Sequence, residues 1–402
     1  MTSQRKAFEG IVVLDLTQGV AGPHSTMLLA QHGADVVKIE PPEGDWGRGL
    51  GEISGDHCAH SIAFNRGKRS IAVDLKSPKG LEVVKKIAAK ANIVIESFRP
   101  GVVKRLGLGY DDIKAINPSV IYTSVSGFGQ TGPNNKRPTV DGLIQAFSGM
   151  MVMNRTAEGW PHRQGMIAVD VTTGLYVFNA LSPALMRQLR FGEGTYLDLS
   201  LMQAAAAWQG AKLMEYIWSN GTPPPLYMPA GTFKTADGHI VLSAMRPHHF
   251  RKLFELVGRD DVANDPTLQT HEDRIRGTPK IMKALNEAMP AKKTAEWIEL
   301  LQAQEVFCER VNNYADYLEH PHVKAVGAVD WVEQPGSKRL PFAQIPGLPP
   351  ARDTDPRLNY APHISENCVE ILKDFGYAQG DIDALFQSKA VVPPAPVAKA
   401  AE

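Results

Sequence analysis

The sequence predicts an α/β fold, with a Rossmann-like large domain on a parallel sheet and a smaller α+β domain joined to it by long linkers. Strand-like and helix-like segments alternate over about the first 130 residues, which is typical of a doubly wound sheet. A glycine- and proline-rich stretch at 221–225 then interrupts the alternation. Beyond it, a hairpin pattern at 231–243 and several helical patterns indicate the second domain.

The N-terminal segment predicts the first βαβ unit. Residues 11–16 and 35–40 are short and rich in valine and isoleucine, as buried strands are. Between them we expect a turn at 17–23 and a helix at 25–32, which Gly33 ends. This order implies two parallel strands joined by a crossover helix.

The alternation continues along the chain. Further strands are expected at 70–75, 92–96, 120–125 and 195–200, and helices from Ser77, at 111–117, at 171–190 and at 201–218. Pro183 lies inside one of these helices and should kink or split it.

The order of these segments sets the expected domain boundaries. We expect the large domain at 1–200, a linker helix at 201–228, the small domain at 229–330, a return linker at 331–363, C-terminal helices that pack on the large domain at 364–389, and a disordered tail at 390–402.

Composition excludes several classes of function. The chain has 402 residues, of which 43% are hydrophobic and 21% charged, as in ordinary globular proteins. Its 43 basic and 43 acidic residues cancel, so no basic excess is available for nucleic acid or an anionic membrane. The three cysteines suggest no disulfide framework, and we find no signal peptide or apolar run long enough to span a membrane. We expect a cytoplasmic protein that acts on a small molecule, without nucleic-acid or membrane partners.

Asp170 is a lone acid between an apolar approach and a long helical pattern. Its simplest interpretation is a helix N-cap, because aspartate accepts the free N–H groups of a first turn. The alternative is chemistry, since a helix N-terminus favours an ionised carboxylate and such a group can act as a nucleophile. The two interpretations are compatible.

Basic residues flank the ends of several predicted strands: Lys68, Arg69, Lys76, Arg99, Lys104 and Arg105. A solvated surface is the default interpretation. Parallel sheets bind ligands at the carboxyl ends of their strands, so Lys76, Arg99 and Arg105 are candidates to hold the phosphates of a nucleotide-like ligand.

Two other kinds of site are weaker. Glu40 follows Gly19 by 21 residues, where the ribose-binding acid of a dinucleotide fold would be, but the turn at 19–22 lacks the G-x-G-x-x-G pattern. The Asp, His and Cys residues at 56–60 lack the spacing of an established zinc site, and nothing in the pattern activates Cys58. We expect loop or cap residues there, with no metal and no nicotinamide or flavin cofactor.

Five stretches carry a resemblance to a known family: GIVVLDLT with AGP at 10–17 and 21–23, GADVVKIE at 33–40, NRGKRSIAVDL at 65–75, ESFRPG at 96–101 and GTYLDLSLMQ at 194–203. Taken in order, they resemble the class III CoA-transferase family, which includes formyl-CoA transferase, L-carnitine CoA-transferase and alpha-methylacyl-CoA racemase. Each stretch alone is modest, but their joint order is specific, and a weaker match extends over nearly the whole chain.

The resemblance implies a site and its ligands. It places the catalytic aspartate at Asp170, and it implies acyl-CoA and a small carboxylic acid as substrates, no tightly bound cofactor, and an interlocked homodimer. The CoA-contacting positions that it implies are Gln18, Val20, Ala21, Val73, Lys76, Ser97, Phe98, Arg99, Arg105 and Val140.

Two departures from the family narrow the reaction. The racemase branch carries a histidine immediately before an acid where this chain has Val140 and Asp141, and Val140 cannot exchange a proton. The formyl-CoA transferase type has a glycine-rich run in its small domain, and no such run lies between Tyr227 and Arg246. We therefore expect transfer rather than racemisation, and either a substrate other than oxalate or a differently gated site.

The expected reaction moves CoA through an aspartyl anhydride and an aspartyl-CoA thioester on Asp170. Exchange between a thioester and a carboxylate needs neither ATP nor a metal. The oxyanions of the intermediates need N–H donors, which we expect from the turns at 19–22 or 127–132. The alternatives are an acyl-CoA racemase or epimerase, and a non-catalytic CoA-binding protein.

Overall fold

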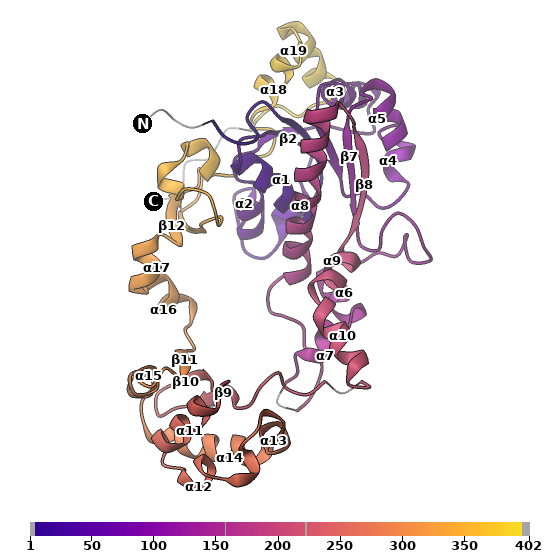
Figure 1. The fold of residues 1–402 in the computed structure, drawn as a ribbon. Coiled ribbons are helices and arrows are strands. Elements are labelled where there is room, and N and C mark those ends of the chain that lie inside the picture. The colour runs from indigo at the N-terminus through magenta and orange to yellow at the C-terminus, as the bar shows by residue number, and fades with distance from the viewer. Residues whose placement is uncertain (1–4, 157, 222, 396–402) are drawn as a thin grey trace. The chain divides into compact units, whose positions relative to one another are not determined.

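The computed structural model describes residues 5–156, 158–221 and 223–395 (Figure 1). The chain divides into two units, of which the first combines the residues up to Gly210 with those from Gly327 onward, and the second is Ala211–Val326. Within the described part of the chain, no helix is both long and apolar enough to cross a membrane.

A six-stranded parallel sheet forms the centre of the first unit, as the sequence predicts. Its strands are β1 (Val12–Leu16), β2 (Asp35–Glu40), β5 (Arg69–Ala72), β6 (Ile93–Glu96), β7 (Ile121–Ser126) and β8 (Thr195–Ser200). Their order across the sheet is β5-β2-β1-β6-β7-β8, and every neighbouring pair is parallel. The order reverses between β1 and β6, and sheets of this kind bind ligands at the carboxyl ends of the strands beside such a reversal.

Helices and short strands complete the first unit. The helices are α1 (Ala21–Gln31), α2 (Ala59–Asn65), α3 (Pro78–Ala88), α4 (Val102–Arg105), α5 (Tyr110–Ile116), α6 (Asp141–Phe147), α7 (Met150–Met153), α8 (Ala168–Phe191), α9 (Leu201–Trp208), α18 (Cys368–Asp374) and α19 (Gln379–Gln387). The 3-10 turns are η1 (Trp46–Gly49), η4 (Ala351–Asp353) and η5 (Pro356–Asn359), and the short strands are β3 (Ile53–Ser54), β4 (His57–Cys58), β12 (Val329–Glu333) and β13 (Arg339–Ala343).

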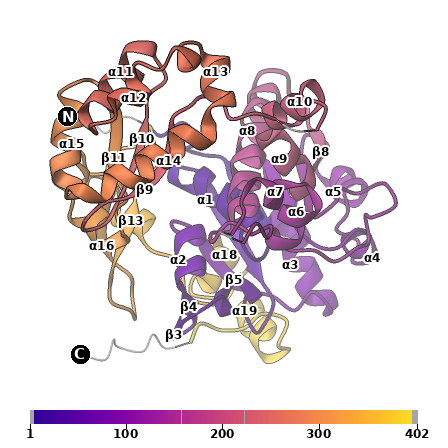
Figure 2. The same ribbon diagram turned by 90° about the horizontal axis from the view of Figure 1, so that it is seen from below.

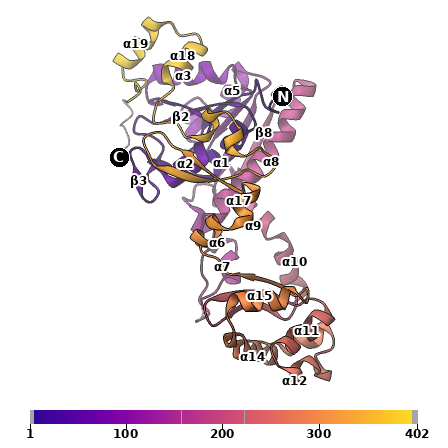
Figure 3. The ribbon, with the colours of Figure 1, turned by 90° about the vertical axis from the view of Figure 1, so that its left-hand side faces the viewer.

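Residues that alternate along the strands build two hydrophobic cores, one on each face of the sheet. Val13 and Ile93 point towards the core that α1 and α8 cover. Leu14 and Val94 belong to the opposite core, which α3, α18 and α19 cover. Figure 3 shows α18 and α19, from the end of the chain, beside α3.

Helices α1 and α8 lie side by side and run in the same direction. In the first turn of α1, His24 Nδ1 donates a hydrogen bond to the carbonyl oxygen of Val171 at 3.0 Å. Further along, the rings of His32 and Phe178 lie 5.1 Å apart. Gly174 permits the close approach, because a Cβ there would lie 2.6 Å from the ring of His24. Both helices therefore begin at the edge of the sheet where β1 ends.

Two helix predictions are wrong in detail. The predicted turn at 17–23 runs into α1, which begins at Ala21. Pro23 fits in the first turn, where backbone N–H groups have no partner within the helix. The pattern predicted as one helix over 201–218 divides into α9 and α10 at Gly210, a residue type that weakens helices.

The proline inside α8 does not split the helix. The element runs unbroken from Ala168 to Phe191 through Pro183, which is exposed. Leu181 and Leu185, on either side of the proline, are buried in the core beside the sheet. Tertiary packing on both sides thus holds a helix that the local sequence disfavours.

The second unit contains a three-stranded antiparallel sheet and several short helices (Figure 2). The hairpin expected at 231–243 is confirmed as β9 and β10, and β11 adds a third strand that the sequence analysis missed. The elements are α10 (Gly210–Trp218), β9 (Ala230–Lys234), β10 (His239–Ser243), α11 (Pro247–Leu256), α12 (Asp260–Ala263), η2 (Pro266–Leu268), α13 (His271–Arg276), α14 (Thr278–Ala288), η3 (Met289–Ala291), α15 (Thr294–Gln302), β11 (Phe307–Arg310), α16 (Tyr314–Glu319) and α17 (Pro321–Val326). Phe233, Phe254 and Trp297 lie in its core.

The end of the chain is partly ordered. Ala390 and Val391 are fully buried, and Val391 pairs antiparallel with Val73, just beyond β5. The predicted disordered tail at 390–402 is therefore wrong for its first residues, because their apolar side chains enter the core beside the sheet. Residues 396–402 lie outside the described part of the chain.

Candidate active site

Asp170 lies in the first turn of α8, at the third helical position, and its side chain is partly exposed. The helix begins earlier than the sequence predicts, so the N-cap position falls on Ile167, whose side chain makes no capping hydrogen bond. The prediction that Asp170 caps the helix is therefore wrong. Its own N–H is one of the first-turn groups that need a partner.

Asp141, at the start of α6, supplies the missing cap. The N–H groups of Val169 and Asp170 both donate to Asp141 Oδ2, at 2.7 and 3.0 Å. Asp141 Oδ1 accepts a hydrogen bond from Gln145 Nε2 at 2.5 Å, and Gln145 Oε1 accepts one from the Gln164 N–H at 2.8 Å. Asp141 is 6% exposed and Gln145 is 1% exposed. A buried network thus fixes the backbone of Asp170.

The surroundings of Asp170 oppose its ionisation. Burial, together with the charge of Asp141, raises the pKa of Asp170 to about 7. The first turn of α8 acts in the opposite sense, since the N-terminus of a helix favours a negative charge. A weakly solvated carboxylate that ionises near neutral pH is suited to act as a nucleophile.

The loop that joins β1 to α1 lies at the same edge of the sheet. The N–H of Gln18 donates to Ser97 Oγ at 2.9 Å, which ties this loop to the loop after β6. The N–H of Gly19 donates to Asp45 Oδ1 at 2.9 Å. The neighbouring residue Val20 is the N-cap of α1 and is buried.

Buried ion pairs support this loop. Lys38 Nζ donates to the carbonyl oxygen of Thr17 at 2.9 Å and pairs with Asp45 at 2.8 Å. Lys68 Nζ pairs with Asp15 Oδ2 at 3.0 Å, and burial lowers the pKa of Lys68 to about 8. Lys68 is therefore a buried residue of the framework and not one of the solvated cations that the sequence suggests.

The expected oxyanion donors are partly occupied. The N–H of Gly19 is bonded to Asp45, and the N–H of Gly129 donates to Ser126 Oγ at 3.0 Å. The N–H groups of Ala21 and Gly22 lie in the first turn of α1, where a helix offers free donors. The turn at 19–22 thus leads into two first-turn donors of α1, the helix that contacts the start of α8 through His24 and Val171.

A cavity of about 470 Å³ lies where β1, β2, β5 and β6 end. Four of the residues implied by the resemblance line it together: Gln18, Val73, Lys76 and Phe98. Leu75, Val102 and Leu106 add an apolar wall, and Lys76 is an exposed cation at its rim. A second cavity of about 430 Å³ shares Gln18 and includes Trp46, whose ring lies over Gly19.

The other implied positions lie outside the first cavity. Ser97 contacts the Gln18 N–H, whereas Arg99 and Arg105 are exposed and follow β6. Val140 is the N-cap of α6 and is 58% exposed. Ala21 is buried in the first turn of α1.

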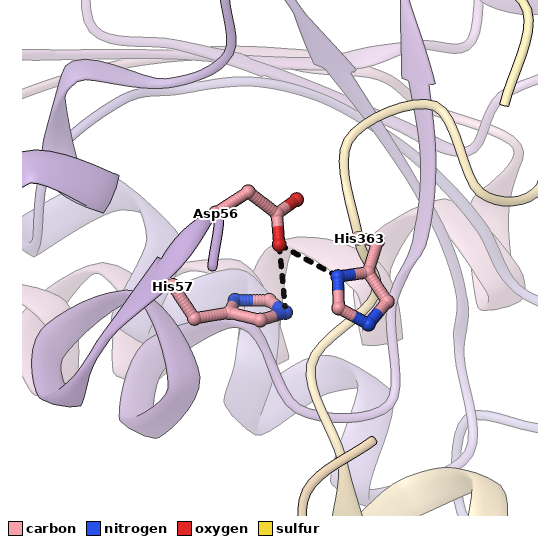
Figure 4. A group of neighbouring side chains, drawn as sticks. All are labelled: Asp56, His57 and His363. Carbon is pink, nitrogen blue, oxygen red and sulfur yellow. Dashed lines mark hydrogen bonds and ion pairs between the residues drawn. The ribbon is translucent and has the colours of Figure 1, made fainter. Parts of the chain in front are cut away.

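A carboxylate and two imidazoles meet in the first unit, although His363 is far from the other two residues in sequence (Figure 4). His363 Nδ1 donates to Asp56 Oδ1 at 2.6 Å, and His57 Nε2 lies 3.7 Å from the same oxygen. Metals use such ligands, but Arg48 Nη1 lies 3.3 Å from His57 Nδ1 and 3.5 Å from Asp56 Oδ2. A guanidinium so close opposes a bound cation, so we interpret the group as a tie between two loops.

This tie should give the folded state a characteristic pH dependence. Bonding to Asp56 raises the pKa of His363, so its stabilisation is complete below the usual histidine value and is lost as pH rises through the raised one. Burial opposes the ionisation of Asp56, but the hydrogen bond from His363 helps to hold the pKa of Asp56 low. The contribution of Asp56 to stability therefore persists until strongly acidic pH.

We expect His363→Gln to lower the free energy of unfolding by about 1 kcal/mol at pH 5.5 and by less at pH 8. Urea unfolding at both pH values measures this, and an equal loss at both would contradict it.

Comparison with known proteins defines the class. The chain matches the model of a family described as CoA-transferase family III over residues 8–366. The protein belongs to this family and is an enzyme of this class, so the resemblance noted in the sequence is confirmed.

Named relatives and solved structures agree with this assignment. The chain is 31% identical over 380 residues to the succinyl-CoA:glutarate CoA-transferase of Homo sapiens, covering 92% of this chain and 86% of the relative. It is 34% identical over 304 residues to the acetyl-CoA:oxalate CoA-transferase of Acetobacter aceti, covering 73% and 78%. The crystal structure of a CaiB/BaiF family protein from Brucella suis superposes with a TM-score of 0.82 at 30% identity, covering 92% of this chain and all of that one.

Proposed function

We propose that this enzyme carries CoA from an acyl-CoA donor to a short dicarboxylic acid, with Asp170 as the nucleophile. The observation that carries the proposal is the setting of Asp170: a partly exposed acid in a helical turn that Asp141 fixes, with its pKa raised to about 7. The acids in the names of the human and Acetobacter aceti relatives, glutarate and oxalate, are both dicarboxylic. We extend that substrate class to this chain.

The proposed reaction begins when ionised Asp170 attacks the thioester carbonyl of the donor. The C–S bond breaks, CoA thiolate leaves, and a mixed anhydride remains. The thiolate then attacks the aspartyl carbonyl, which releases the donor acid and leaves an aspartyl-CoA thioester. The acceptor carboxylate expels the thiolate again to form a second anhydride, and attack of the thiolate on the acceptor acyl group regenerates Asp170. The N–H groups of Ala21 and Gly22 are candidates to stabilise the oxyanions.

The CoA moiety is proposed to occupy the cavity at the strand ends. Its lining by Gln18, Val73, Lys76 and Phe98 supports this placement through its apolar wall, and Lys76 at the rim is a cation beside the acids Glu43 and Asp74. Arg99 and Arg105 are exposed, and each is next in sequence to a residue that lines the cavity, Phe98 or Leu106. We propose that they pair with the phosphates of CoA. The positions Val20, Ala21, Ser97 and Val140 complete the proposed binding set.

We also propose that the enzyme works as a homodimer whose chains interlock. Exposed apolar side chains on α8 support this proposal, because they offer a surface on which a second chain can pack. Among them are Met186, Leu189 and Phe191, which are 57%, 62% and 63% exposed. Light scattering on the purified protein is expected to give twice the mass of one chain. A monomeric mass at micromolar concentration would contradict the dimer.

The substrate class can be tested directly. The protein is incubated with succinyl-CoA and a panel of mono- and dicarboxylic acids, and the CoA esters are followed by mass spectrometry. We expect new CoA esters of short dicarboxylic acids, and no deuterium incorporation at the α-carbon of a 2-methylacyl-CoA in heavy water. Deuterium wash-in without transfer would instead support the racemase, and the absence of both would support a non-catalytic CoA-binding protein.

A further inference from the structure

The second unit contains a cavity that the proposed reaction does not use. It has a volume of about 310 Å³ and is bordered by the first turns of α11 and by the segment from α12 to α13. His248, Arg251 and Arg274 line it, together with the apolar side chains of Phe250, Ala263 and Leu268. The lining thus contains two arginines, one histidine and no acid.

Arg274 is a buried cation of this cavity. Its residue is 4% exposed. Its Nε donates to the carbonyl oxygen of Leu268 at 2.9 Å, its Nη2 donates to that of Gln269 at 3.1 Å, and the guanidinium lies 4.3 Å from the ring centre of Phe250. These contacts fix the plane of the guanidinium but bring no negative charge to it.

The nearby acids are engaged elsewhere. Asp273 pairs with Arg276, and Asp265 pairs with Lys280. Among the described residues, neither Arg274 nor Arg251 forms an ion pair. Asp273 acts on Arg274 through its charge but forms its ion pair with Arg276, so the buried guanidinium keeps a free capacity for an anion that enters the cavity.

The first turn of α11 adds to the positive potential. The helix starts at Pro247 and has no side-chain cap. The N-terminus of a helix attracts anions through its free N–H groups and its dipole. His248 and Arg251 are exposed and lie three positions apart, so they occupy the same side of the helix.

We propose that this cavity binds the oxyanion of a small ligand, a carboxylate or a phosphate group, between Arg274 and Arg251, with the apolar body of the ligand against Phe250, Ala263 and Leu268. The guanidinium groups supply charge-assisted hydrogen bonds, and the apolar wall selects a ligand that carries a short hydrocarbon part. The hydrogen bonds from Arg274 to two carbonyl oxygens are compatible with this role, because they orient the guanidinium before the ligand binds.

Calorimetric titration of the full-length protein tests the proposal. Butyrate and inorganic phosphate serve as probes, with CoA in excess so that the proposed site at the strand ends is filled. Arg251→Gln is expected to weaken binding by at least about tenfold. Lys252→Gln is the matched control, because it removes the same charge at the next position, where Lys252 pairs with Glu255 at 3.4 Å instead of lining the cavity. Tighter binding of butyrate assigns the site to carboxylates, and tighter binding of phosphate assigns it to phosphate groups.

A second measurement locates the bound probe. The imidazole resonances of His248 should shift when the probe is added, and the shift should be lost in Arg251→Gln. The proposal would be overturned if neither butyrate nor phosphate binds at about 10 mM. The unfolding transition of the protein used must be unchanged, which shows that the protein is folded. An equal effect of Arg251→Gln and Lys252→Gln would overturn it too, since it would show general charge attraction rather than a site.

Discussion

Asp170→Ala is expected to abolish CoA transfer, with a loss of at least about 10⁴-fold in rate, while CoA binding persists. The expectation follows from covalent catalysis: without the carboxylate neither the anhydride nor the aspartyl-CoA thioester can form. The proposed CoA contacts lie at the strand ends and do not include Asp170. The measurement is the initial rate of CoA ester exchange, with CoA affinity determined separately by calorimetry.

A control variant and a second measurement make this test specific to Asp170. Asp111→Asn alters an exposed acid in the first turn of α5 and should leave the rate unchanged, which controls for a simple change of charge at a helix start. In the unaltered enzyme, donor acyl-CoA should leave a CoA adduct on the peptide that contains Asp170. Substantial residual transfer by Asp170→Ala, or an adduct on another peptide, would refute the assignment.

Asp141→Ala is expected to lower the transfer rate by about 10- to 100-fold and the free energy of unfolding by about 1 kcal/mol. The stability loss reflects the removal of the acceptor for two N–H groups at the start of α8. The rate loss reflects a nucleophile whose backbone is no longer held. Thermal unfolding and initial rates measure the two effects.

The pH dependence separates an electrostatic role of Asp141 from a merely structural one. Asp170 must be ionised to attack, so transfer in the unaltered enzyme should rise as pH increases through about 7. The charge of Asp141 contributes to the raised pKa of Asp170, so its removal should move this rise to lower pH. Asp141→Asn keeps one of the two oxygen acceptors, for the N–H groups of α8 but not for Gln145, so it should recover part of the stability while retaining the shifted profile. An unchanged profile in both variants would contradict the electrostatic role.

Short-range patterns in the sequence predict much of the fold. Alternating apolar strands and helical patterns identify the parallel sheet, and the strand ends indicate the edge at which Lys76 lines a cavity, whereas Gln18 and Phe98 in the same lining are implied only by the family resemblance. These predictions succeed because a parallel sheet places all its carboxyl ends on one side.

Contacts between distant segments could not be predicted in the same way. Asp141 caps a helix that begins 27 residues after it, across a loop whose path no local pattern determines. His363 reaches Asp56 from the other end of the chain. Lys68 has the same appearance in sequence as an exposed lysine, and only the three-dimensional placement of Asp15 makes it a buried ion pair.

The pairing of Val391 beyond β5 has a consequence for how the protein is handled. β5 is one of the two edge strands of the sheet, and its free backbone groups would otherwise be a template for strands of other chains. The N–H of Val392 donates to the carbonyl oxygen of Ala72 at 3.0 Å, so the last ordered residues occupy part of this template. Shortening the chain to residue 389 would uncover it, and the shortened protein should form aggregates larger than the oligomer of the full-length protein.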